Sequence, residues 1–241
     1  MLKRNAMATG HGISLGVSPG GHEYLLDDRL RDRFELHIAD LTYYQLGPFQ
    51  LGDPKLQDLP LSVQNRSFDL AIVDGHHLIH REGIRSWDRD RLLVSQMIIA
   101  LQSVKRGGDV VIKLGKAEEI RTAKILSMFD TICAELVTCK PASMHRNRST
   151  FYAICKGIGI GSEDGKWVYF LDHLKKLWVE ITFGGDKGCG RFMEEEDLDF
   201  IISREELVES YLPRLIELGR DVWRGQAEGL RVTLRRRGIR F

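Results

Sequence analysis

Short apolar runs alternate with segments of helical spacing over the first two thirds of the chain. Each run ends abruptly in a polar residue or a glycine, which is typical of buried parallel strands that emerge at one edge of a sheet. Such strands are expected at residues 11–17, 34–39, 68–73 and 109–114. Between the last two, apolar residues spaced as in an amphipathic helix predict a helix over 89–105, ended by Gly107 and Gly108. This alternation predicts an α/β fold with a mostly parallel sheet.

The chain from about residue 118 onward has a different pattern. After a predicted helix over 118–129, strands are expected at 134–139 and 149–156 with no helix between them, so they should pair antiparallel at the end of the sheet. A glycine-rich stretch at 157–165 then suggests a domain boundary. We therefore expect one domain over 1–158 and a helical C-terminal extension over 159–241. Helices within that extension are predicted at 166–178, 204–218 and 220–234.

Composition restricts the class of protein. The 241 residues carry a formal net charge of +1 and 43% hydrophobic residues, which excludes an intrinsically disordered chain. No apolar run approaches the ~20 residues that cross a bilayer, so no membrane association is expected. The four cysteines form no CxxC pair and show no disulfide-like spacing. They are expected to be inert core thiols in a reducing compartment, the cytoplasm or the nucleus.

Three charged residues stand where ligands bind in open α/β sheets, outside the carboxyl ends of parallel strands. Asp40 follows the predicted strand FELHIA, and Asp74 follows FDLAIV. Lys113 lies near the end of VVIKLG, where an apolar strand would leave its ammonium without solvation. A carboxylate on the neighbouring strand would offset that cost, so we expect Lys113 to meet Asp74.

Several ordered motifs resemble the FtsJ-like methyltransferases. The similar segments are FDLAIVDG, RLLVSQMIIALQSVKRGG, DVVIKLGK and KPASMHRNRSTFYAICKG, and the match as a whole covers roughly residues 1–158. The resemblance implies a Rossmann-like methyltransferase sheet, S-adenosylmethionine as cofactor, and methylation of RNA ribose 2′-hydroxyls with RNA as the partner. The likeness is closest to a fungal branch that carries appended helices and a TFGG segment.

The resemblance also implies roles for individual residues. Asp74 and Lys113 match two members of the family's catalytic Lys-Asp-Lys-Glu tetrad. Asp40 and Leu41, in the segment ADLT, match the residues that contact the cofactor's adenine, and Asp74 also borders the cofactor. The final Glu of the tetrad is expected just before the last FY, where this chain has Ser149 and Thr150. The departure leaves open an alternative, a methyltransferase-like binding module without full activity.

The cofactor's glycine loop has two candidate positions. One is the segment LGVSPGG at residues 15–21, which resembles the family's loop but leaves only one strand before 68–73 where the fold normally has two. In the other, ATGHGISL is the second strand, and the loop, the first strand and the first tetrad Lys lie before Met1. We favour the second, which predicts an N-terminally truncated chain. The first interpretation starts a helix at His22–Leu26, and the second makes GGHEYLL itself a helix.

Two further polar groups invite functional interpretation. His76, His77 and His80 lie near Asp74, but no second segment offers a converging ligand pair, so no metal site is expected. Arg146 and Arg148, in the loop before the last strand, are candidates for contact with phosphate.

Overall fold

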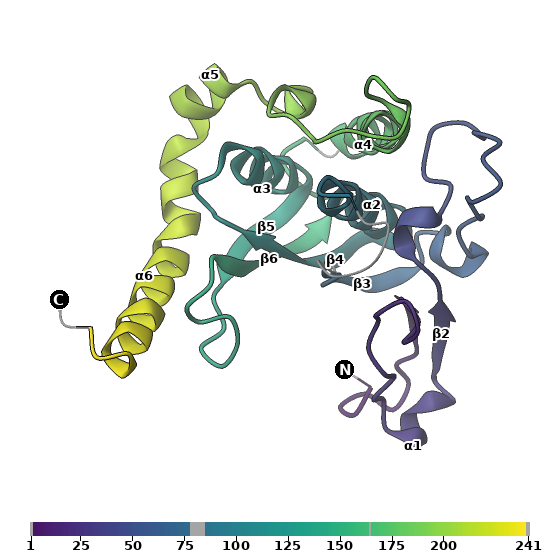
Figure 1. The fold of residues 1–241 in the computed structure, drawn as a ribbon, viewed down its shortest axis with the longest axis horizontal. Coiled ribbons are helices and arrows are strands. Elements are labelled where there is room, and N and C mark those ends of the chain that lie inside the picture. The colour runs from purple at the N-terminus through teal and green to yellow at the C-terminus, as the bar shows by residue number, and fades with distance from the viewer. Residues whose placement is uncertain (1, 78–84, 164, 240–241) are drawn as a thin grey trace.

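The computed structural model describes residues 2–77, 85–163 and 165–239, which form two β-sheets with helices (Figure 1). A two-stranded parallel sheet consists of β1 (Gly10–Ser14) and β2 (Phe34–Ile38). A four-stranded sheet has the order β3-β4-β6-β5. Its strands are β3 (Phe68–Val73), β4 (Val104–Gly115), β5 (Cys133–Cys139) and β6 (Thr150–Ile158).

The strand directions agree with a mostly parallel sheet. β3 and β4 are parallel, whereas β6 runs antiparallel to both β4 and β5, which confirms the antiparallel pair expected at the end of the sheet. The protein is therefore α/β with a mixed four-stranded sheet. The expectation that all the N-terminal strands join this sheet is wrong. Within the described residues no ladder connects β1 or β2 to β3, so these two strands form a sheet of their own.

Helices cover one face of the four-stranded sheet (Figure 1). Helices α2 (Asp88–Ser103) and α3 (Ile120–Ile132) lie against the strands, and α4 (Lys166–Phe183) packs on both of them as an outer layer. Alternation along β4 explains this arrangement, because every second side chain points to the same face of a sheet. The side chains of Val110, Ile112 and Leu114 are buried, and those between them remain partly exposed.

The glycine pair 107–108 has a different role from the one predicted. α2 ends at Ser103 and β4 begins at once with Val104, so the glycines lie inside the strand. There the pairing with β3 shifts: Phe68 is opposite Val104, but Leu70 is opposite Asp109. Gly107 has a φ of 81°, and a Cβ on Gly108 would lie 3.0 Å from the Phe68 carbonyl oxygen. The glycines therefore permit a bulge that resets the register.

The C-terminal segment contains one long helix where two were expected. After α5 (Arg204–Glu206) and a π-helical turn (Leu207–Tyr211), α6 runs without a break from Leu212 to Arg236. Gly219 does not end it, because Leu215, Leu218 and Val222 continue one buried face across the glycine. The helix expected at GGHEYLL is also absent. A single turn, α1 (Asp28–Arg31), forms instead.

One apolar core extends from the sheet through α2 and α3 into α4. Trp178 of α4 is fully buried, and its indole Nε1 donates a hydrogen bond of 3.1 Å to Ser95 Oγ of α2. All four cysteines are free, but only Cys133 and Cys155 are buried, so the expectation of core positions fails for Cys139 and Cys189. Across the described residues, none of the helices has the length and apolar character of a membrane span.

We predict that Trp178→Phe lowers the free energy of unfolding by about 1–3 kcal/mol, because the buried Ser95 hydroxyl loses its partner. Trp178→Ala should cost about 3–5 kcal/mol, since it also leaves a cavity. Urea unfolding of the variants measures both effects. Adding Ser95→Ala to Trp178→Phe should recover part of the loss. An unchanged free energy of unfolding in Trp178→Phe contradicts this account.

Candidate functional site

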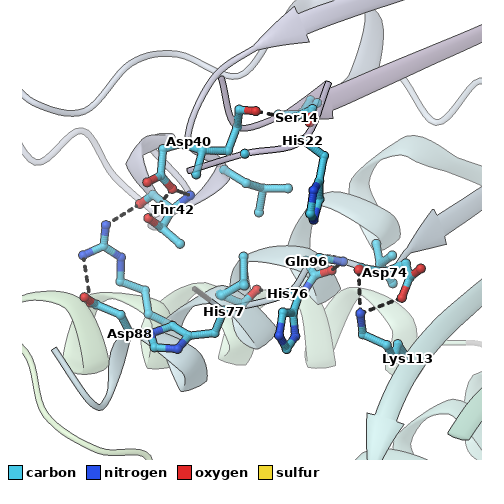
Figure 2. Close-up of a pocket in the computed structure, with 18 of the residues that line it drawn as sticks. Ser14, His22, Asp40, Thr42, Asp74, His76, His77, Asp88, Gln96 and Lys113 are labelled. Atoms are coloured by element: carbon cyan, nitrogen blue, oxygen red, sulfur yellow. Dashed lines mark hydrogen bonds and ion pairs between the residues drawn. The ribbon is translucent and has the colours of Figure 1, made fainter. Parts of the chain in front are cut away.

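A cavity of about 770 Å³ opens between the two sheets (Figure 2). Its walls come from the carboxyl ends of β1 and β2 on one side and those of β3 and β4 on the other. The first turns of α2 and the loop before β6 complete it. All the residues that the sequence singled out at strand ends line this one cavity, namely Asp40, Leu41, Asp74 and Lys113.

Asp74 and Lys113 form an ion pair at the edge of the four-stranded sheet. Because Val73 is opposite Ile112 in the parallel ladder, the next residues of the two strands lie side by side. Lys113 Nζ is 2.7 Å from Asp74 Oδ1 and donates a second hydrogen bond, also 2.7 Å, to the Asp74 carbonyl oxygen. The Lys113 side chain is only 17% exposed, against 50% for Asp74. The interaction expected from the sequence thus holds the ammonium at the cavity wall.

Tyr152 adds a third group to this ion pair. It is opposite Lys113 in the antiparallel ladder between β4 and β6, and its hydroxyl donates to Asp74 Oδ1 over 3.3 Å. Burial and the nearby Asp74 carboxylate both raise the pKa of Tyr152 above its ordinary value. The phenol therefore stays protonated at neutral pH and helps to fix the carboxylate.

Asp40 lies on the opposite side of the cavity, in the turn after β2 (Figure 2). Its carboxylate accepts hydrogen bonds from the Thr42 amide (3.0 Å) and the Thr42 hydroxyl (2.7 Å), and so caps the 3₁₀ turn Leu41–Tyr43. Arg91 of α2 fastens this turn to the main sheet's helices, because its guanidinium donates to the Thr42 carbonyl oxygen over 2.9 Å. The same guanidinium lies 5.0 Å from the centre of the Tyr43 ring. The two walls are therefore joined through α2.

The segment LGVSPGG follows β1 and reaches the cavity through Leu15 and Gly21. Tight turns hold it: the Gly21 amide donates to the Gly16 carbonyl oxygen, and a Cβ on Gly21 would lie 2.0 Å from the Leu15 carbonyl oxygen. Gly75 gives a second close backbone approach, because its amide donates to Gln96 Oε1 over 2.7 Å. Glycine is thus required at position 21, where a Cβ would collide with backbone.

Basic side chains gather at one end of the cavity. Lys113, His76, His145 and Arg148 all line it. Partial burial lowers the pKa of His76, and the positive charges of Lys113 and Arg148 lower it further. This end of the cavity is accordingly suited to an anion.

Thr150, at the start of β6, lines the cavity. Of the two arginines in the loop before β6, Arg148 lines the cavity and Arg146 does not. The Arg146 guanidinium nitrogen Nη2 lies 4.0 Å from Glu228 Oε2 of α6. His76 and His77 are at the cavity, and His80 falls outside the described residues.

Sequence reasoning missed Arg91, Gln96 and His145, which lie in the helix or loop nearest the cavity. Arg91 and Gln96 carried a weak signal as polar residues within the apolar helix after FDLAIV, and His145 carried none.

Comparison with known proteins adds little to this geometry. No protein-family model matches the sequence, and no curated protein matches it. Among solved structures, one described as "Alphavirus P23pro-zbd" aligns with 79% of this chain at 14% identity and a TM-score of 0.41. The aligned region spans only 26% of that chain. A likeness at this level supports no statement about function.

We predict that His76 titrates below its ordinary pKa of about 6.5. The unfolded chain then binds this proton at a higher pH than the folded protein, so His76 contributes a loss of stability as the pH falls through that range. NMR titration of the ring protons should show the His76 pKa rising in Lys113→Met, because one nearby positive charge is gone. Lys116→Met, which alters a lysine paired with Glu119, should leave it unchanged. Equal His76 pKa values in both variants would refute the electrostatic coupling.

Proposed function

We propose that this protein is an S-adenosylmethionine-dependent methyltransferase with a Rossmann-like catalytic domain, acting on RNA ribose 2′-hydroxyls. The observation that carries the proposal is the Asp74–Lys113 ion pair in the wall of a cavity of about 770 Å³ at the ends of parallel strands. That volume is within the range of small-molecule and cofactor sites. The sequence motifs around these residues resemble those of the FtsJ-like enzymes, which supports the same reaction.

The chemistry of the cavity fits the proposed cofactor. S-adenosylmethionine combines an adenosine unit with a sulfonium and an amino-acid end that carries both charges. The cavity offers the Asp40 and Asp74 carboxylates for cationic and hydroxyl groups, and Arg148 for a carboxylate. Leu15, Leu41 and Ile72 supply apolar surface for a ring. Asp40 and Leu41 are proposed to hold the adenosine unit, with Asp74 nearer the reacting end.

The residues of the ion pair have distinct proposed roles. When bound, S-adenosylmethionine supplies an electrophilic methyl group to the ribose oxygen, which loses its proton. Lys113 makes two hydrogen bonds to Asp74, and an ammonium has three hydrogens, so one remains to hold and orient the ribose oxygen. The Asp74 carboxylate receives the hydroxyl proton and passes it to water. Tyr152 keeps the carboxylate in place. Alignment of reactants by such groups supplies ~7 kcal/mol or more of barrier reduction.

Basic groups beside the cavity support RNA as the substrate. The loop before β6 places Arg148 and His145 at the cavity and Arg146 on the adjoining surface. α6 fixes this loop: Asn147 Nδ2 donates to Thr233 Oγ1 over 3.3 Å, and Gly229 approaches the Arg146 carbonyl so closely that a Cβ would lie 2.3 Å from its oxygen. We propose that this loop contacts phosphates flanking the target ribose.

Thr150 favours a second candidate, a binding module that retains the cofactor and RNA but does not transfer methyl groups efficiently. Thr150 lines the cavity, and in the sequence it stands directly before the FY where the resemblance expects the final carboxylate. The two candidates differ in one measurable step, the chemical transfer itself.

We predict that the full chain binds S-adenosylmethionine and that Asp40→Ala weakens binding at least about tenfold, as loss of a charged hydrogen-bond partner of roughly 1.5–3 kcal/mol implies. Isothermal titration calorimetry measures the dissociation constants. Asp28→Ala is the matched control, because that carboxylate is 86% exposed in α1, away from the cavity. If the folded chain binds no cofactor, both candidate functions fail.

We predict that the protein transfers methyl groups from labelled S-adenosylmethionine to RNA and that Lys113→Ala abolishes transfer without abolishing cofactor binding. Lys116→Ala, which removes an exposed lysine just after the end of β4, should retain activity. A DNA oligonucleotide of the same sequence, which lacks the 2′-hydroxyl, should accept no methyl group. Cofactor and RNA binding without any transfer would support the binding module and reject the enzyme.

A further inference from the structure

Two histidines and a glutamate converge on the face of the small β1–β2 sheet. The parallel register places His11 directly opposite Glu35, and His37 lies two residues further along β2, so all three side chains share one face. His11 Nδ1 is 3.0 Å from Glu35 Oε2, and His37 Nε2 is 3.2 Å from Glu35 Oε1. One atom from each residue can be chosen so that all three lie within 4.8 Å of one another.

The two ring nitrogens are unusually placed for ordinary ion pairs. Both are shielded from solvent, and within the described residues neither makes a hydrogen bond of acceptable geometry. The carboxylate oxygens are close enough, so the direction of the nitrogens is what fails. The ring of Phe68 in β3 packs edge-on against the His11 ring, with 5.2 Å between ring centres. The His37 ring stacks on the His11 ring, with 6.5 Å between ring centres. The two nitrogens therefore lie beside the carboxylate with their hydrogen-bonding capacity unused.

We propose that His11, Glu35 and His37 bind one divalent transition-metal ion, Zn²⁺. In a tetrahedral site with bonds of about 2.0–2.1 Å, neighbouring ligand atoms lie about 3.3 Å apart. The 3.0 and 3.2 Å distances, each to a different oxygen of Glu35, are near that separation, and one ligand atom from each of the three residues lies within 4.8 Å of the others. Two imidazoles and one carboxylate are also a ligand set that Zn²⁺ uses with water as the fourth ligand. The Glu35 side chain is 56% exposed, so water reaches the site.

The ion would cross-link two strands that are otherwise weakly held. A two-stranded sheet is marginally stable by itself, and β1 and β2 lack a ladder to the main sheet within the described residues. Ser14, the last residue of β1, and Asp40, just beyond the end of β2, line the cavity. The site therefore stabilises one wall of that cavity, and it does so whether or not the proposed methyltransferase activity is correct.

The test uses the full chain after treatment with a chelator and dialysis. Titration with Zn²⁺ in a calorimeter should show one equivalent bound, and the melting temperature should rise, because an ion that binds the folded state stabilises it. Co²⁺ should give the intense visible absorption bands of tetrahedral coordination. Failure to bind one equivalent of either ion overturns the proposal.

Variants locate the ion. Loss of groups that merely support a ligand costs 10–100-fold in affinity, so Glu35→Gln and His37→Gln, which remove ligands, should each weaken Zn²⁺ binding at least about tenfold. His173→Gln, in α4, is the matched control and should bind as the parent does. The double variant His76→Gln/His77→Gln tests the cavity histidines.

Binding unchanged in Glu35→Gln and His37→Gln, or lost only in the His76/His77 double variant, contradicts the assignment. Circular dichroism of the metal-free variants checks folding. Glu35→Gln alters an exposed side chain and retains its shape, so it decides the matter if His37→Gln does not fold.

Discussion

The register between β3 and β4 is the constraint on which the candidate site depends. Three extra residues of β4 are taken up between Phe68 and Leu70, where Gly107 adopts a positive φ and Gly108 allows close approach. Beyond this bulge the ladder is regular, and it ends with Asp74 beside Lys113. Because the side-chain period of a strand is two residues, a slip by one would turn Lys113 toward the buried face under the helices. The ion pair and the apolar core therefore require the same register.

The cavity exists because two sheets with separate hydrogen-bond ladders face each other. Their contact depends on α2, which packs on β3 and through Arg91 holds the turn after β2. Asp40 is occupied locally by capping that turn, yet its position makes it part of the wall opposite Asp74. The same residue thus links local chain geometry to the candidate binding chemistry.

The C-terminal helices contribute in two places. α4 closes the core over α2 and α3 and buries Trp178 against Ser95. α6 packs on β5 and, through Gly229 and Thr233, sets the course of the loop that carries Arg148 to the cavity. A segment far from the strand ends in sequence therefore determines which basic groups border the candidate site.

Periodicity in the sequence determined the α/β class and the approximate positions of β2 to β6, because burial of alternate or helically spaced side chains is a local property. The charged residues at the ends of these strands then indicated the pairing of Asp74 with Lys113. The sequence pattern predicted the wrong structure around Gly107, Gly108 and Gly219. A glycine is found at the end of a helix, in a bulge and within a continuous helix, and the sequence alone does not distinguish these cases, because they differ in which residues are near in space. Only the tertiary structure decided that β1 and β2 stand apart, that Arg91 and His145 reach the cavity, and that His11 meets Glu35 and His37. Those contacts join residues from different elements, and their distances follow from register and packing that no local pattern contains.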